Sequence, residues 1–146
     1  MFFLQKELSK KDLCLFISIQ ITAAILGTIF ANYIFGLSII EISSNIRSGT
    51  NIYISEVFAS FGLLMVILLS KVGGKNIVAF NVGIYITAAI IFTSSASFAN
   101  PAVSIARIFT ESFAGINPST VIFFIGSQVI GMFGAYFLYN RLFKTK

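Results

Sequence analysis

The dominant pattern along the chain is a series of long apolar runs separated by short polar segments. A helix needs about 20 residues to cross a bilayer. Four runs are long enough, and they cover residues 13–35, 52–69, 77–92 and 121–139. A fifth apolar stretch, residues 100–109, is too short to span. The pattern therefore predicts an all-α membrane protein with four transmembrane helices and one short additional helix.

Small residues recur at every fourth position on the first and the last predicted span. They are Ala23, Gly27 and Ala31, followed much later by Ser127, Gly131 and Ala135. Ridges of small side chains let two helix backbones approach closely within a membrane. We therefore expect close helix packing, which by itself indicates nothing about transport.

The composition supports lipid as the surrounding solvent and argues against catalysis. Apolar residues make up 57% of the chain and charged residues only 10%, whereas about a quarter of a soluble domain is charged. The chain contains no histidine, and Cys14 is its single cysteine. The commonest catalytic base, an internal disulfide and a zinc-type cluster are therefore excluded. We expect no metal, no cofactor and no enzymatic activity, and a membrane enzyme is the least favoured class.

The net charge of +5 comes from basic residues grouped at the ends of the apolar runs. Eight of the ten flank the spans on one predicted side, and two lie in the opposite loops. The eight are Lys6, Lys10, Lys11, Lys71, Lys75, Arg141, Lys144 and Lys146, and the two are Arg47 and Arg107. Cytoplasmic loops of membrane proteins carry the excess of Lys and Arg. The pattern predicts a multi-pass protein with both termini in the cytoplasm, and it favours membrane retention over nucleic-acid binding.

The segment between the third and fourth spans combines small polar residues with a short apolar helix. Asn100 is a good helix N-cap, and Pro101 is a good first helical residue. Non-helical backbone at membrane depth is tolerated only where protein or a water-filled cavity covers it. A re-entrant half-helix would point its partial positive N-terminus at the membrane midplane. From periodicity alone, an exposed loop followed by an interfacial helix remains an equal alternative.

The tripeptide Asn100-Pro101-Ala102 resembles the signature of the aquaporin (major intrinsic protein) family. In that family two Asn-Pro-Ala half-helices meet at mid-membrane. The resemblance extends over nearly the whole chain, because the four spans look like the family's third to sixth helices. It implies a passive channel for water and small neutral solutes, without a cofactor. It also implies a homo-oligomer, a tetramer, in the lipid bilayer of a bacterial inner (plasma) membrane.

The chain departs from the family in the number of its spans. A complete member has six spans and two motifs related as inverted repeats, whereas this sequence shows four spans and one motif. Residues 1–6 look like the tail of a first half-helix. We therefore expect an incomplete six-helix fold, truncated at its N-terminus. The alternative is a non-conducting remnant or a membrane assembly subunit.

A second departure concerns selectivity. Val103 follows the motif where most members have an arginine, and Arg107 comes one helical turn later. The stretch resembles a bacterial subgroup associated with passage of arsenite and methylated arsenicals. The other constriction positions implied by the resemblance are Ala88 and Ser97. Because these side chains are small and uncharged, we expect a wide opening that favours glycerol-like or arsenite-like solutes.

Several polar residues have roles implied by the resemblance or left open by the sequence. Asn100 is expected to donate its side-chain amide to the solute and to cap the half-helix. Glu56, matching a family glutamate, is expected to hold the pore loop through backbone N–H groups, and Gln20 to hydrogen-bond another helix. Arg107 has two interpretations: pairing with Glu111 four residues later, or a role in the outer vestibule.

Overall fold

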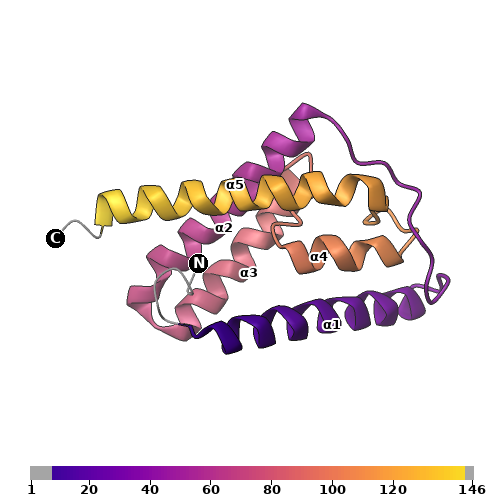
Figure 1. Ribbon diagram of the computed structural model, residues 1–146, viewed down its shortest axis with the longest axis horizontal. Helices are drawn as coiled ribbons and strands as arrows, with labels where there is room; N and C mark the ends of the chain where they lie inside the picture. The colour runs from indigo at the N-terminus through magenta and orange to yellow at the C-terminus, as the bar shows by residue number, and fades with distance from the viewer. Residues whose placement is uncertain (1–7, 144–146) are drawn as a thin grey trace. The chain divides into compact units, whose positions relative to one another are not determined.

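The computed structural model describes residues 8–143, and every regular element among them is a helix. The elements are α1 (Lys10–Ile34), α2 (Thr50–Ser70), η1 (Lys71–Gly73), α3 (Lys75–Phe92), α4 (Pro101–Ala106), η2 (Arg107–Phe109) and α5 (Pro118–Phe143) (Figure 1). The all-α class predicted from the sequence is confirmed.

Four of these helices are long and apolar enough to cross a membrane. They cover Lys10–Ile34, Thr50–Gly73, Lys75–Phe92 and Pro118–Phe143, and their mean hydropathy lies between 1.6 and 2.2. Most of them extend a few residues beyond the predicted apolar runs, because the polar residues at the ends of those runs are also helical. The chain is therefore a multi-pass membrane protein.

Two of the long helices, α1 and α5, begin where a side chain accepts from one of their first N–H groups. Ser9 caps α1, and its Oγ accepts a hydrogen bond from the backbone N of Asp12 at 3.1 Å. Asn117 precedes Pro118, and its Oδ1 accepts from the backbone N of Ser119 at 3.0 Å. Proline suits a first helical position because the N–H it lacks would have no partner there.

The chain divides into two compact units, each assembled from segments that are distant in sequence. The first unit combines residues 8–47 with Pro101–Ile122 and contains α1, α4 and η2. The second combines Ser48–Asn100 with residues 123–143 and contains α2, η1, α3 and most of α5.

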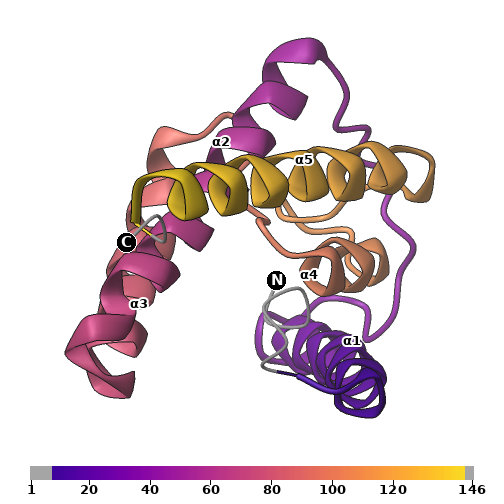
Figure 2. The same cartoon turned by 60° about the vertical axis from the view of Figure 1, so that its left-hand side comes forward.

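In the first unit, the short helix α4 lies alongside α1 (Figures 1 and 2). Every fourth residue on the contacting face of α1, namely Ala24, Thr28 and Asn32, is at least partly buried. The predicted ridge at Gly27 lies on a neighbouring, exposed face, where a Cβ would meet no atom within 4 Å. That ridge is thus not packed against another helix in the described part of the chain.

In the second unit, α2 packs against both α3 and α5. The Tyr85 hydroxyl of α3 donates to the carbonyl of Ala59 at 2.9 Å. On α5, a Cβ at Gly131 would lie only 2.3 Å from the backbone oxygen of Val57 on α2. Close backbone approach at the second ridge, Ser127, Gly131 and Ala135, is confirmed, since all three residues are buried.

Candidate functional site

The loop that joins α3 to the Asn-Pro-Ala tripeptide has a strained backbone. Three of its residues other than glycine have positive φ angles: Ala96 (59°), Ser97 (46°) and Ala99 (49°). The left-handed region costs a residue with a side chain about 1–3 kcal/mol unless its surroundings hold it there. Residues that bind this loop are therefore needed to maintain its shape.

Glu56 of α2 is the central anchor of this loop. Its side chain is fully buried, and Oε1 accepts hydrogen bonds from the backbone N of Ala99 and from Nε2 of Gln128, the latter at 2.8 Å. One carboxylate oxygen therefore connects α2, the loop and α5 within the second unit. This geometry suits the supporting role expected for Glu56, and the role itself stays a prediction.

The loop also supports itself through its own side chains. Ser95 Oγ accepts from the backbone N of Ser97 at 3.2 Å, and Thr93 Oγ1 donates to the carbonyl of Ala89 at 2.6 Å. The Ser97 hydroxyl is buried and makes no hydrogen bond to another residue that the structure describes. Ser97 thus places an oxygen with unused hydrogen-bonding capacity beside the strained backbone.

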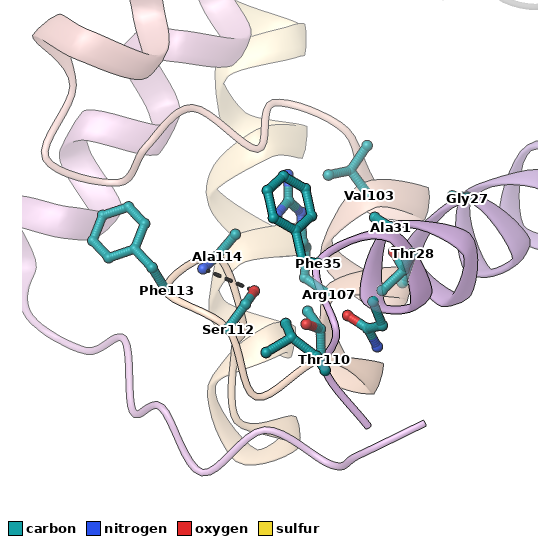
Figure 3. Close-up of a pocket in the computed structure, with 14 residues that line it drawn as sticks. Gly27, Thr28, Ala31, Phe35, Val103, Arg107, Thr110, Ser112, Phe113 and Ala114 are labelled. Carbon is teal, nitrogen blue, oxygen red and sulfur yellow. Dashed lines mark hydrogen bonds between the residues drawn. The ribbon is translucent and has the colours of Figure 1, made fainter. Parts of the chain in front are cut away.

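We call the segment formed by α4 and η2 the half-helix. In the first unit, this half-helix and α1 line an open cavity of about 800 Å³ (Figure 3). Its walls are mostly apolar, with Val103 and Arg107 on one side and one face of α1 on the other. The lining residues are Ala24, Gly27, Thr28, Ala31, Asn32, Phe35, Leu37, Val103, Ala106, Arg107, Thr110, Ser112, Phe113 and Ala114. The structure brings Val103 and Arg107 together on this cavity, whose lining includes no carboxylate.

Two loops of the first unit hold Glu111 in a hydrogen-bonded position. One carboxylate oxygen accepts from the backbone N of Ser44 at 2.6 Å, and the other accepts from the Ser44 hydroxyl. These bonds lower the pKa of Glu111 from its ordinary value of 4.5. Glu111 therefore ties two loops together, whichever interpretation of Arg107 holds.

The remaining predicted site residues are distributed over both units. Asn100 ends the second unit, and α4 begins at Pro101, with Ala102 buried in its first turn. Ala88 is exposed on α3, beside a shallow apolar groove. Gln20 is exposed on α1 and hydrogen-bonds no other described residue, so its expected interhelical bond stays a prediction. The common constriction of Ala88, Ser97 and Val103 likewise stays a prediction.

Sequence reasoning missed several residues that organise these sites. Asn32 and Gln128 are buried amides within apolar spans, and polar residues at such positions usually have partners. That signal was present in the sequence. Ser44 and Arg47 gave no such signal, because polar residues in loops are ordinary.

Comparison with known proteins gives one informative similarity. No protein-family model matches the chain, and no solved structure matches it. Over 130 residues, or 89% of its length, the chain is 39% identical to the aquaglyceroporin AqpS of Rhizobium meliloti strain 1021. The matched region is 56% of that relative, so the chain spans little more than half of the relative's length.

Proposed function

We propose that this chain belongs to the aquaporin family and forms part of a passive transmembrane channel for water and small neutral solutes. The observation that carries the proposal is the half-helix that begins at Pro101, directly after a strained loop anchored by Glu56. The similarity to an aquaglyceroporin supports it. A channel accounts for these features better than an enzyme does, because the conspicuous site is a loop and a half-helix.

The half-helix provides the proposed barrier to ions. The N-terminus of a helix carries roughly half a positive charge. Placed at mid-membrane, that charge would repel cations, while the Asn100 amide would hydrogen-bond a neutral solute. Arg107 adds a positive charge to the cavity, whose lining holds no acidic residue. Water and polyols would therefore pass in preference to metal cations.

The width of the proposed constriction determines which solutes pass. Val103, Ala88 and Ser97 are proposed to form the constriction, and all three side chains are small. An opening without an arginine at position 103 would admit glycerol-like solutes and neutral arsenicals such as arsenite. The relative is named an aquaglyceroporin, which is consistent with solutes of the size of glycerol. The resemblance further leads us to propose a bacterial inner membrane and a homotetramer, and the distribution of basic residues leads us to propose cytoplasmic termini.

A non-conducting assembly subunit is the second candidate. The apolar window of α1 has none of its residues buried, and the chain spans 56% of the relative. These observations favour a pathway that is closed only when further protein packs around α1. We therefore expect the 146 residues alone to conduct poorly.

The test is solute flux into proteoliposomes, measured by stopped-flow light scattering with water, glycerol and arsenite. Flux is measured with the chain alone and with the chain fused to the part of the relative that lies outside the matched region. In the conducting form, Val103→Arg should lower glycerol flux relative to water by about tenfold or more, since filling a pocket discriminates by that order. Val103→Thr, which keeps the size of the side chain, is the control.

Two results would contradict the proposal. A joined protein that inserts correctly but passes none of the three solutes would favour the assembly subunit. A valine form that passes water and excludes glycerol and arsenite would show that the opening is narrow.

A further inference from the structure

The far end of the half-helix is held by three separate donors. The last carbonyls of a helix have no partner within the helix. Here the carbonyl of Arg107 accepts from the backbone N of Ile116 at 3.1 Å, and that of Ile108 accepts from the backbone N of Ser43 at 2.9 Å. The carbonyl of Phe109 accepts from the Asn32 side chain at 2.9 Å. The donors come from three different segments of the first unit.

Asn32 is the side chain among these donors, and it is built into the packing. Its side chain is 3% exposed, near the end of an apolar span. An asparagine side-chain amide has two N–H groups. Here Nδ2 donates one hydrogen bond to the carbonyl of Phe109 and a second to the carbonyl of Ile39, the latter at 3.1 Å. Asn32 therefore joins α1, the half-helix and the segment 39–47, which we call the strap.

The strap makes further contacts with the loop that follows the half-helix. Arg47 Nε donates to the carbonyl of Gly115 at 2.8 Å, and Arg47 Nη2 donates to that of Phe113 at 2.5 Å. A Cβ at Gly115 would lie 2.2 Å from the backbone oxygen of Thr110 and 2.3 Å from Ser43 Oγ, so a larger residue would disturb both the loop and its contact with the strap. The strap is thus closely packed against this loop.

We propose that Asn32 is a positioning residue. It fixes the C-terminal end of the half-helix and so sets how accessible Val103 is from the cavity. Val103 lies six residues before Phe109, roughly 9 Å along a helix. A short helix moves nearly as a rigid body, so loss of its end anchor shifts Val103 against α1. The consequence for solute passage rests on the proposed function, whereas the anchoring itself does not.

The experiment measures access to position 103 directly. Val103→Cys is made in a Cys14→Ser background of the full chain, and its reaction rate with a small neutral maleimide is followed. Asn32→Asp keeps the shape of the side chain but removes both N–H donors. We expect it to change the labelling rate by about tenfold, because it removes the two hydrogen bonds by which Asn32 holds Phe109 and Ile39. Asn32→Gln, which keeps the amide, should restore part of the original rate.

Asn81→Asp is the matched control. Asn81 also donates a side-chain hydrogen bond, to Ser70 Oγ at 2.8 Å, but it lies in the second unit. If both aspartate variants lower thermal stability and neither changes labelling at position 103, Asn32 is only structural and the proposal is overturned. If Asn32→Asp fails to fold, Asn32→Ser provides the same comparison with a shorter side chain.

Labelling and flux separate the two proposals. A changed labelling rate in a joined protein that passes no solute supports the positioning role and overturns the proposed function. A changed glycerol-to-water flux ratio together with changed labelling supports both.

Discussion

Glu56 is a buried carboxylate whose hydrogen bonds hold a strained loop, so its charge should matter for stability. Glu56→Gln should lower the free energy of unfolding by about 1.5–3 kcal/mol, the contribution of a hydrogen bond to a charged group. Unfolding in detergent measures this change. Hydrogen exchange at the Ala99 amide should accelerate at the same time, because that N–H binds Glu56.

Glu41→Gln is the control for this substitution. It removes the same charge, but from an exposed side chain on the strap. An unchanged stability of Glu56→Gln, combined with altered solute preference, would assign Glu56 to selectivity instead of support.

Glu111 should make stability depend on pH. Its folded-state pKa is lowered below 4.5 by hydrogen bonds from Ser44. A carboxyl with a lowered pKa stabilises the fold above its unfolded-state pKa, and this contribution disappears as the pH falls through the lowered value. The melting temperature of the parent should therefore exceed that of Glu111→Gln at about pH 6, and the difference should shrink below pH 4.5.

A melting-temperature difference that persists unchanged into strong acid would show that Glu111 acts by packing and not through its charge. Glu41→Gln again serves as the comparison, because this substitution removes the same charge from another loop of the first unit.

At the scale of elements, the contact between α2 and α5 depends on one glycine. A Cβ at Gly131 would lie 2.3 Å from the Val57 oxygen and 2.9 Å from the Phe61 nitrogen, both backbone atoms. Gly131→Ala should therefore force the helices apart and cost about 1–3 kcal/mol. Gly126, on the same helix, has no atom within 4 Å of its Cβ position. Gly126→Ala should be neutral or slightly stabilising, because alanine favours helix.

Thermal unfolding of the two variants side by side provides the measurement. Equal effects at positions 126 and 131 would mean that helix propensity, and not the α2–α5 contact, determines the outcome.

The sequence predicts these elements well, but it does not predict how their ends are held. Long apolar runs are sufficient to identify the spans, and Asn100-Pro101 marks where α4 begins. The bond from Glu56 to the loop was foreseen only through the family resemblance, since a lone glutamate in a span has many candidate partners. The Asn32 anchor depends on backbone carbonyls at positions 39 and 109. Carbonyls carry no sequence signature, so such contacts need coordinates.

For the whole molecule, the two compact units interleave along the sequence. The half-helix belongs to the unit built on α1, although α3 precedes it and α5 follows it in sequence. The segment 101–122 therefore depends on α1 and the strap for its anchor, and changes in residues 32–47 should affect the half-helix more than changes in α3 do.

The distribution of basic residues predicts how the whole chain is oriented in the membrane. Lys75 and Arg141 lie in the basic-rich segments, which face the cytoplasm in membrane proteins. Ser48, in the segment between α1 and α2, should then face outward. All three positions are exposed, so single cysteines introduced there in a Cys14→Ser background should react readily. A membrane-impermeant maleimide applied to spheroplasts should label Ser48→Cys directly, and Lys75→Cys and Arg141→Cys only after permeabilisation. If Lys75→Cys and Arg141→Cys reacted from opposite sides, the number of membrane crossings between them would be odd instead of even. Either α3 or α5 would then fail to cross, and the half-helix between them could not enter the membrane as proposed.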